Sequence, residues 1–230
     1  MTIAENIARI RANMAAAARE AGRDPKEILL VGASKMNDAA ACREAVAAGI
    51  DALGENRVQE MVQKLEQHAY DGAPLHFIGH LQRNKVKQVV GHVALIQSVG
   101  SLELLDEIEK VAAARGLVQD ILLEVNIGRE AAKSGFAPEK VLPAAEAALE
   151  RNHVRVRGLM TIPPADAQRD ANFRYFQEVQ ALYVDMNQKL FHNELEYLSM
   201  GMSGDYEDAI RAGATMVRVG SAIFGARHYN

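Results

Sequence analysis

Short apolar runs alternate along the chain with longer segments in which apolar residues recur every three or four positions. Ile3, Ile7, Ile10 and Met14 have this helical spacing and predict an amphipathic helix that ends near Gly22. Eight apolar runs follow, and each of the first seven precedes a helical pattern. The predicted strands are 28–34, 51–55, 75–81, 94–99, 121–126, 156–162, 197–202 and 216–220. The predicted helices between them are 39–48, 58–68, 84–90, 102–114, 141–149, 171–190 and 206–212.

This alternation predicts the fold class. Strands joined by crossover helices form parallel sheets, and eight such units at near-regular spacing predict a closed (β/α)8 TIM-type barrel of the α/β class. Only residues 223–230 follow the last strand, so we expect the extra N-terminal helix to fill the place of a helix after strand eight. A doubly wound open sheet is the alternative. We expect residues 1–230 to form one barrel domain.

Composition narrows the classes of function. The chain has 26 Lys and Arg against 30 Asp and Glu, a net charge of -4, so no basic field is available to hold nucleic acid. No apolar run approaches the length of a membrane span, and the N-terminal segment lacks the features of a signal peptide. The single cysteine, Cys42, is predicted to be a small core residue, which suits a reducing compartment. We therefore expect a cytoplasmic protein that binds neither nucleic acid nor membrane.

Lys35 is the first candidate for chemistry. It closes the apolar run 28–34, so the predicted fold delivers its amine to the carboxyl end of the sheet. Ligands bind at that end in α/β proteins. A partly desolvated lysine held by a strand can condense with a carbonyl as a Schiff base. This segment alone leaves open the alternative of a lysine exposed to solvent.

Two turns rich in small residues are candidates for holding a phosphate group. Strand seven leads into 201–204, Gly-Met-Ser-Gly, and strand eight ends at Gly220 and Ser221. Barrels often hold a phosphate in the loops after these two strands. Glycine lets the backbone approach an anion, and Ser203 can cap a helix that begins near Asp205. Each turn also occurs in proteins that bind nothing, so the argument depends on finding both opposite Lys35.

Arg218 is predicted to point into the barrel. Period-two alternation puts it on one face of strand eight, with Val217 and Val219 on the other face against the helices. A buried guanidinium needs an acceptor. Spacing leaves two acceptors open: a carboxylate such as Glu55 or Glu124, or a ligand.

A metal site is not expected. His76 and His80 lie on one face of a predicted strand, but four residues of strand separate them too widely to share one ion. No nearby cysteine or aspartate completes a ligand set.

Eight ordered motifs, spread from residue 31 to residue 225, carry a resemblance to a known family that extends over nearly the whole chain. They are VGASK (31–35), GENRVQE (54–60), HFIGHLQRNK (76–85), EVN (124–126), KSG (133–135), RGLM (157–160), LSMGMS (198–203) and MVRVGSAIFG (216–225). The chain resembles the pyridoxal phosphate homeostasis protein family, the barrels related to the N-terminal half of alanine racemase. His80 departs from the pattern, because the family commonly has proline after the glycine of the third strand. Gly32, Arg83 and Gly100 are also less usual.

The resemblance implies a cofactor and a role for each site residue. Lys35 would carry pyridoxal 5'-phosphate (PLP) as a Schiff base, and Arg218 would face the pyridine nitrogen. A guanidinium does not readily give up its proton, so it would leave that nitrogen unprotonated and the cofactor a weak electron sink. The phosphate group would be held by Ser203, Gly220 and Ser221. The pocket would be lined by Asn56 and Ser199.

The expected function follows from the resemblance and from the groups that catalysis needs. Racemisation or decarboxylation on PLP needs a positioned acid and base, and racemase relatives take one from a second domain that this chain, ending at Asn230, does not show. We expect a non-catalytic, monomeric protein that binds PLP in vitamin B6 and amino-acid homeostasis, with apo PLP-dependent enzymes as candidate recipients. The alternative is an amino-acid racemase or decarboxylase with Tyr206, His76 or His80 as the base. A cofactor-free lysine aldolase acting on a phosphosugar is a third hypothesis.

Overall fold

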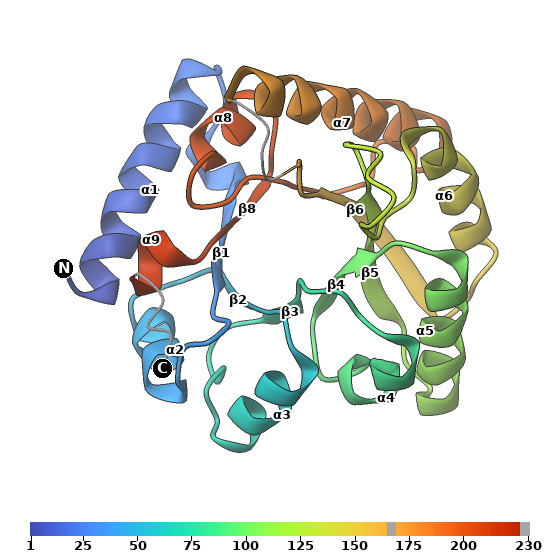
Figure 1. Cartoon of the computed structure of the whole chain (residues 1–230), viewed down its shortest axis with the longest axis horizontal. Helices are drawn as coiled ribbons and strands as arrows, with labels where there is room; N and C mark the ends of the chain where they lie inside the picture. Colours follow the sequence, from blue (N-terminus) through green and yellow to red (C-terminus); the bar gives the residue numbers. More distant parts are fainter. Residues whose placement is uncertain (165–168, 226–230) are drawn as a thin grey trace.

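The computed structural model of the chain describes residues 1–164 and 169–225. Eight parallel strands close into a ring, and helices surround it (Figure 1). Each strand pairs with its neighbours in sequence, and β8 also pairs with β1. The strands are β1 (Leu29–Ala33), β2 (Ala52–Glu55), β3 (Leu75–Phe77), β4 (Leu95–Val99), β5 (Gln119–Val125), β6 (Val154–Thr161), β7 (Tyr197–Ser199) and β8 (Met216–Val219). The predicted barrel is therefore confirmed, and the open sheet is wrong because the last strand pairs with the first and the ring has no edge strand.

The N-terminal helix completes the outer layer. Helix α1 (Ile3–Glu20) lies against α2, α8 and α9, in the place expected for it (Figure 1). Thr2 and Glu5 form a capping box that starts this helix. The other helices are α2 (Ala39–Ala47), α3 (Val58–Glu66), α4 (Val86–Val89), α5 (Leu102–Arg115), α6 (Val141–Leu149), α7 (Arg169–Leu190), α8 (Tyr206–Arg211) and α9 (Ser221–Phe224), with 3-10 turns η1 (Pro25–Glu27), η2 (Arg83–Lys85) and η3 (Pro138–Lys140). Residues 226–230, at the end of the expected last segment, lie outside the described residues.

The strands separate two apolar layers. The larger lies between the strands and the helices and includes Val217 and Val219. The smaller fills the inside of the ring and includes Met216. Alternation along β8 therefore turns Arg218 inward, as predicted, because side chains on a strand point to opposite faces in turn.

Strand β3 is shorter than predicted. It ends at Phe77 because Gly79 packs directly on the backbone of Asn56, where an added Cβ would lie 2.1 Å from the Asn56 carbonyl oxygen. His76 consequently stays on the strand and is buried, whereas His80 lies on the following loop and is exposed. The expectation that the two histidines share a strand face is wrong.

Candidate functional site

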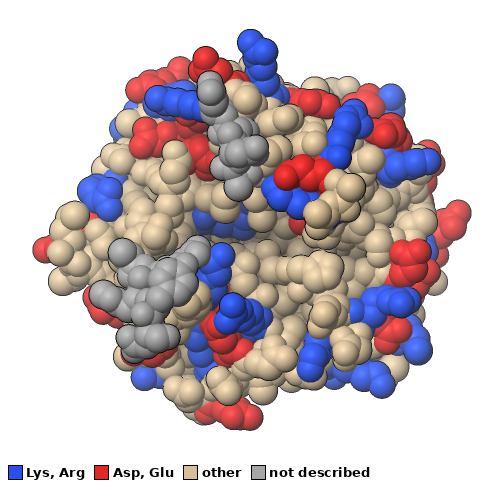
Figure 2. Space-filling model, in the orientation of Figure 1, with Lys and Arg blue, Asp and Glu red and all other residues tan. Residues whose placement is uncertain are grey.

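Four adjacent strands bring all the predicted site residues to one side of the barrel mouth. The ring order places β7, β8, β1 and β2 side by side. Figure 2 shows a hollow over the centre of the ring, with lysine or arginine atoms inside it. The residues at these strand ends are Lys35 after β1, Asn56 after β2, Ser199 on β7, Ser203 in the following loop, Arg218 on β8, and Gly220 and Ser221 after β8.

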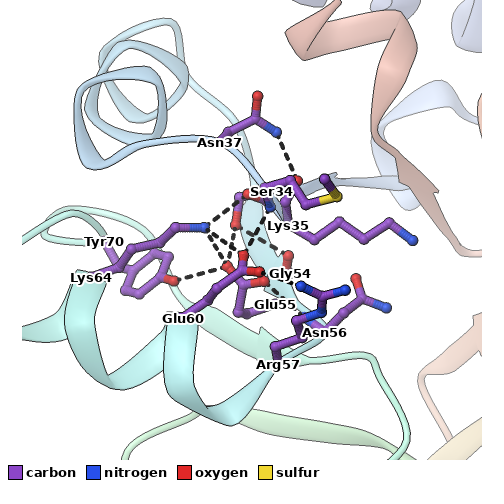
Figure 3. Close-up of polar contacts among 11 residues, drawn as sticks. Ser34, Lys35, Asn37, Gly54, Glu55, Asn56, Arg57, Glu60, Lys64 and Tyr70 are labelled. Atoms are coloured by element: carbon purple, nitrogen blue, oxygen red, sulfur yellow. Dashed lines mark hydrogen bonds and ion pairs between the residues drawn. The ribbon is translucent and has the colours of Figure 1, made fainter. Parts of the chain in front are cut away.

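Lys35 is partly buried on the loop that leaves β1. Its carbonyl oxygen accepts a hydrogen bond from Asn37 Nδ2 at 3.0 Å. In Figure 3 its side chain extends away from the cluster of Ser34, Glu55 and Lys64. The amine therefore belongs to the barrel mouth rather than to the polar cluster behind the strands.

Asn56 presents a polar atom that lacks a partner among the described residues. Its Oδ1 is buried and accepts no hydrogen bond from the described residues. Its backbone N–H donates to Glu55 Oε1 at 2.9 Å, so the backbone of Asn56 is held in place. Buried polar atoms are almost always satisfied, and an orphaned one beside a candidate site indicates a place for a donor from a ligand or a water.

The turns after β7 and β8 are joined by Ser203. Its Oγ accepts hydrogen bonds from the backbone N–H groups of Gly220 at 3.2 Å and Ala222 at 3.3 Å. The predicted capping role of Ser203 is wrong, because Asp205 is the N-cap residue of α8. Two backbone donors therefore converge on one oxygen, as they do in anion sites, and in this structure that oxygen is the Ser203 hydroxyl. Ser221 lies exposed beside this cradle.

Arg218 lies within the barrel and is only 3% exposed. Its Nη1 donates to Ser199 Oγ at 2.6 Å and its Nη2 to the Thr161 carbonyl oxygen at 2.8 Å. Burial lowers the pKa of Arg218 to about 10, so it keeps its charge at neutral pH. Among the described residues it forms no ion pair, and Glu55 pairs instead with Lys64. The sequence left open an ion pair between Arg218 and a carboxylate such as Glu55 or Glu124. The described residues form no such ion pair.

A hydrogen-bonded chain behind Arg218 was not predicted. Ser199 Oγ donates to Gln97 Oε1 at 2.7 Å, and Gln97 Nε2 lies 3.0 Å from His76 Nδ1. Burial lowers the pKa of His76 to about 4, so this histidine is neutral at physiological pH. Period-two alternation along 94–99 would have placed Gln97 inside with Leu95, and that signal could have identified it.

The groups considered as catalytic bases do not gather around Lys35. Tyr206 is buried and its hydroxyl accepts from Asn13 Nδ2 of α1 at 3.1 Å. His76 is enclosed within the barrel beside Gln97. His80 lies exposed on the β3 loop, in a cleft that it shares with Arg83 and Lys133.

Two further properties concern the described part of the chain. Across residues 1–164 and 169–225, no three side chains of His, Cys, Asp or Glu are grouped so that they could hold a metal ion. Within the same residues, no helix combines the length and the apolar character needed to span a membrane.

Comparisons with known proteins agree with the geometry. The family model for the N-terminal domain of alanine racemase matches residues 6–228. The pyridoxal phosphate homeostasis protein of Pseudomonas aeruginosa is 42% identical over 228 residues, which cover 99% of this chain and 97% of that protein. PipY of Synechococcus elongatus, in a structure with PLP bound, is 31% identical at a TM-score of 0.85, and the match covers 97% of this chain and 100% of that one.

Alanine racemase from Clostridium difficile shares the fold at 18% identity and a TM-score of 0.72. That match covers 96% of this chain and 57% of the racemase. The full-length relatives are much more similar than the racemase is. The chain therefore belongs to the pyridoxal phosphate homeostasis protein family.

Proposed function

We propose that this chain binds PLP through a Schiff base on Lys35 and takes part in vitamin B6 and amino-acid homeostasis without substantial turnover of its own. One observation carries the proposal: β8 and β1 are neighbours, so the backbone N–H donors of Gly220 and Ala222 and the loop of Lys35 lie at adjacent strand ends. The PLP-bound structure of PipY, similar over the whole chain, supports the choice of ligand.

The residues present fit the chemistry of PLP. The backbone donors that converge on Ser203 Oγ suit a phosphate group, and the orphaned Asn56 Oδ1 suits a hydroxyl or amine donor. PLP supplies an aldehyde that condenses with amines and a ring that withdraws electrons. Lys35 in its neutral form would attack the aldehyde carbon, a C=N bond would replace C=O, and one water would leave.

The remaining site residues receive the following proposed roles. Arg218 would face the pyridine nitrogen and, because it stays protonated, leave that nitrogen unprotonated. Ser199 would keep Arg218 in place through their 2.6 Å hydrogen bond. Ser221, exposed next to Gly220, would add a hydroxyl to the phosphate contacts.

Two observations support a binding role over catalysis. The proposed contact with Arg218 agrees with them, because an unprotonated pyridine nitrogen makes the ring a weaker electron sink. Tyr206 faces α1, and His76 is neutral and enclosed, so neither is available to move a proton near Lys35. The full-length relatives are named as homeostasis proteins. We further propose a cytoplasmic monomer of one domain that passes PLP to apo PLP-dependent enzymes.

The alternative is a racemase or decarboxylase. The observation in its favour is the exposed His80 imidazole beside the barrel mouth, which could serve as a base. A third hypothesis, the cofactor-free lysine aldolase, uses the same lysine and phosphate cradle. Visible absorbance separates the two PLP-binding hypotheses from the aldolase, because a PLP Schiff base absorbs visible light and a free lysine does not.

Borohydride reduction followed by peptide mapping tests the proposed function. Purified protein saturated with PLP is expected to be yellow, and reduction is expected to leave a phosphopyridoxyl group on the Lys35 peptide. Lys35→Ala removes the colour and the adduct, whereas Lys26→Ala, an exposed lysine before β1, changes neither. Protein that stays colourless at saturating PLP overturns the proposal. Steady conversion of one amino-acid enantiomer, abolished by Lys35→Ala, establishes the enzyme instead.

A further inference from the structure

The backbone around Lys35 is held by two side chains of helix α3 that the proposed cofactor contacts do not use. The Ser34 carbonyl oxygen, before the lysine, accepts a hydrogen bond from Lys64 Nζ at 2.9 Å. The Met36 N–H, after the lysine, donates to Glu60 Oε2 at 2.8 Å. The peptide groups on both sides of Lys35 are therefore fixed by the same helix.

Met36 has an unusual backbone conformation. Its φ of 63° lies in the left-handed region, which few residues other than glycine, asparagine and aspartate adopt. Met36 is 45% exposed as a residue, so close packing does not account for the conformation. Backbone strain of this kind persists only where the surroundings hold it, and it gathers at ligand sites. Two hydrogen bonds hold it here: one from the Met36 N–H to Glu60, and one that closes the turn, from the Asn37 N–H to the Ser34 carbonyl oxygen at 3.1 Å.

The two side chains of α3 belong to a buried charged cluster (Figure 3). Lys64 Nζ lies 2.6 Å from Glu55 Oε2 and 3.6 Å from Glu60 Oε2. Glu55 also accepts from the Tyr70 hydroxyl at 3.2 Å and from the backbone N–H of Asn56 at 2.9 Å. The cluster therefore links α3 to the ends of β1 and β2, where both Lys35 and Asn56 begin their loops.

We propose that Glu60 and Lys64 are positioning residues for Lys35, an inference that rests on the proposed function. They maintain the left-handed turn at Met36 and the orientation of the Ser34 carbonyl, and so direct the lysine amine to the barrel mouth. Without the Glu60 acceptor, Met36 relaxes toward negative φ and the Cα–Cβ direction of Lys35 changes. A cluster that only stabilised the fold would leave the geometry of the bound ligand unchanged.

Two pairs of variants test this inference. Glu60→Ala removes the acceptor, whereas Glu60→Gln keeps an oxygen for the Met36 N–H. Met36→Val and Met36→Asn form the second pair, because a β-branched residue disfavours left-handed φ and asparagine tolerates it. Glu66→Ala, an exposed position on the same helix, is the matched control. The measurements are the PLP dissociation constant, the circular dichroism of bound PLP, and the melting temperature of the apo-protein.

We expect Glu60→Ala and Met36→Val to weaken PLP binding about tenfold, the effect of losing one hydrogen bond to a charged group. Both also change the circular dichroism of bound PLP. Glu60→Gln and Met36→Asn stay within about threefold of the unmodified protein, and Glu66→Ala matches it. The inference is overturned if Glu60→Ala and Met36→Val keep the original affinity and dichroism. It is also overturned if affinity simply follows melting temperature across the set.

Failure of the proposed function is distinguishable from failure of this inference. If the unmodified protein binds no PLP, the proposed function is wrong. Amide hydrogen exchange in the apo-protein then tests whether Glu60 holds the backbone beside Lys35. The Met36 amide is then expected to exchange faster in Glu60→Ala than in Glu60→Gln. Equal exchange rates overturn the positioning role of Glu60.

Discussion

Two cations are buried at this end of the barrel, and their surroundings differ in kind. Lys64 lies outside the ring of strands, 6% exposed, with its ammonium 2.6 Å from the Glu55 carboxylate. Arg218 lies inside the ring, 3% exposed, and donates to the Ser199 hydroxyl and the Thr161 carbonyl oxygen. The chain neutralises the first charge with carboxylates. It meets the second, among the described residues, with neutral acceptors only.

The difference supports the proposal that Arg218, unlike Lys64, faces a ligand. A buried charge without a counter-charge lowers stability, because neutral acceptors replace only part of its hydration. Glu124 and Asp205 raise the pKa of Arg218 from a distance, but burial has the larger effect and lowers it. A barrel selected only for stability would pair this arginine with a carboxylate or replace it with an apolar residue. We therefore interpret Arg218 as a charge kept for a ligand.

The same substitution at both cations gives the largest expected effect. Lys64→Met leaves the buried Glu55 carboxylate without its ammonium, and we expect the free energy of unfolding of the apo-protein to fall by about 3–5 kcal/mol. Arg218→Met removes a charge that has no carboxylate partner, which raises stability, and it also removes the donor to Ser199 and Thr161, which lowers it. Because the two effects oppose each other, we expect a net change within about 1 kcal/mol. Urea unfolding of the two apo variants measures both values. Equal losses would mean that Arg218 is as structural as Lys64 and would remove the distinction.

The second largest expected effect is that of pH on the free energy of unfolding, through His76 in the neutral hydrogen-bonded chain behind Arg218. Burial lowers the pKa of folded His76 to about 4, against 6.5 without burial, so the unfolded chain binds more protons between these values. The stability due to neutral His76 is complete above pH 6.5 and is lost as the pH falls toward 4. At pH 5 the loss amounts to about 2 kcal/mol.

The control for this prediction is His76→Gln, which cannot be protonated in this range. Unfolding in urea at pH 7 and pH 5 is compared for the original protein and the variant. We expect the original protein to lose about 2 kcal/mol more than the variant on acidification. The same pH dependence in both proteins would show that His76 is not kept neutral by burial.

The contrast between the two cations also marks what the sequence could predict. Alternation along β8 was sufficient to turn Arg218 inward, because the period of a strand fixes the face of every residue. The order of strands and helices followed in the same way from apolar spacing. The partners of Arg218 could not be predicted, because Ser199 and Thr161 come from other strands and their level in the barrel depends on register.

Three features depended on packing that spacing does not encode. The end of β3 at Phe77 is set by the approach of Gly79 to the backbone of Asn56. Ser203 bonds the turn after β8 instead of capping α8, because the ring closure brings the two turns together. Nothing in its sequence position distinguishes Lys64 from other helix lysines, and only the contact of α3 with the strand ends reveals its carboxylate partner.

The smallest expected effect tests whether the neutral acceptors of Arg218 matter individually. Ser199→Ala removes the hydroxyl between Arg218 and Gln97 and leaves a buried donor and acceptor without that partner, so we expect the unfolding free energy to fall by about 1–2 kcal/mol.

The matched substitution is Ser98→Ala on β4, where the buried Oγ has no partner among the described residues. Removing an unsatisfied hydroxyl sacrifices no hydrogen bond, so we expect a change within about 0.5 kcal/mol, in either direction. Urea unfolding of the apo-proteins compares the two. If Ser98→Ala destabilises as much as Ser199→Ala, the chain from Arg218 to Gln97 adds nothing beyond ordinary packing of the serine, and the neutral environment of Arg218 is not built by specific hydrogen bonds.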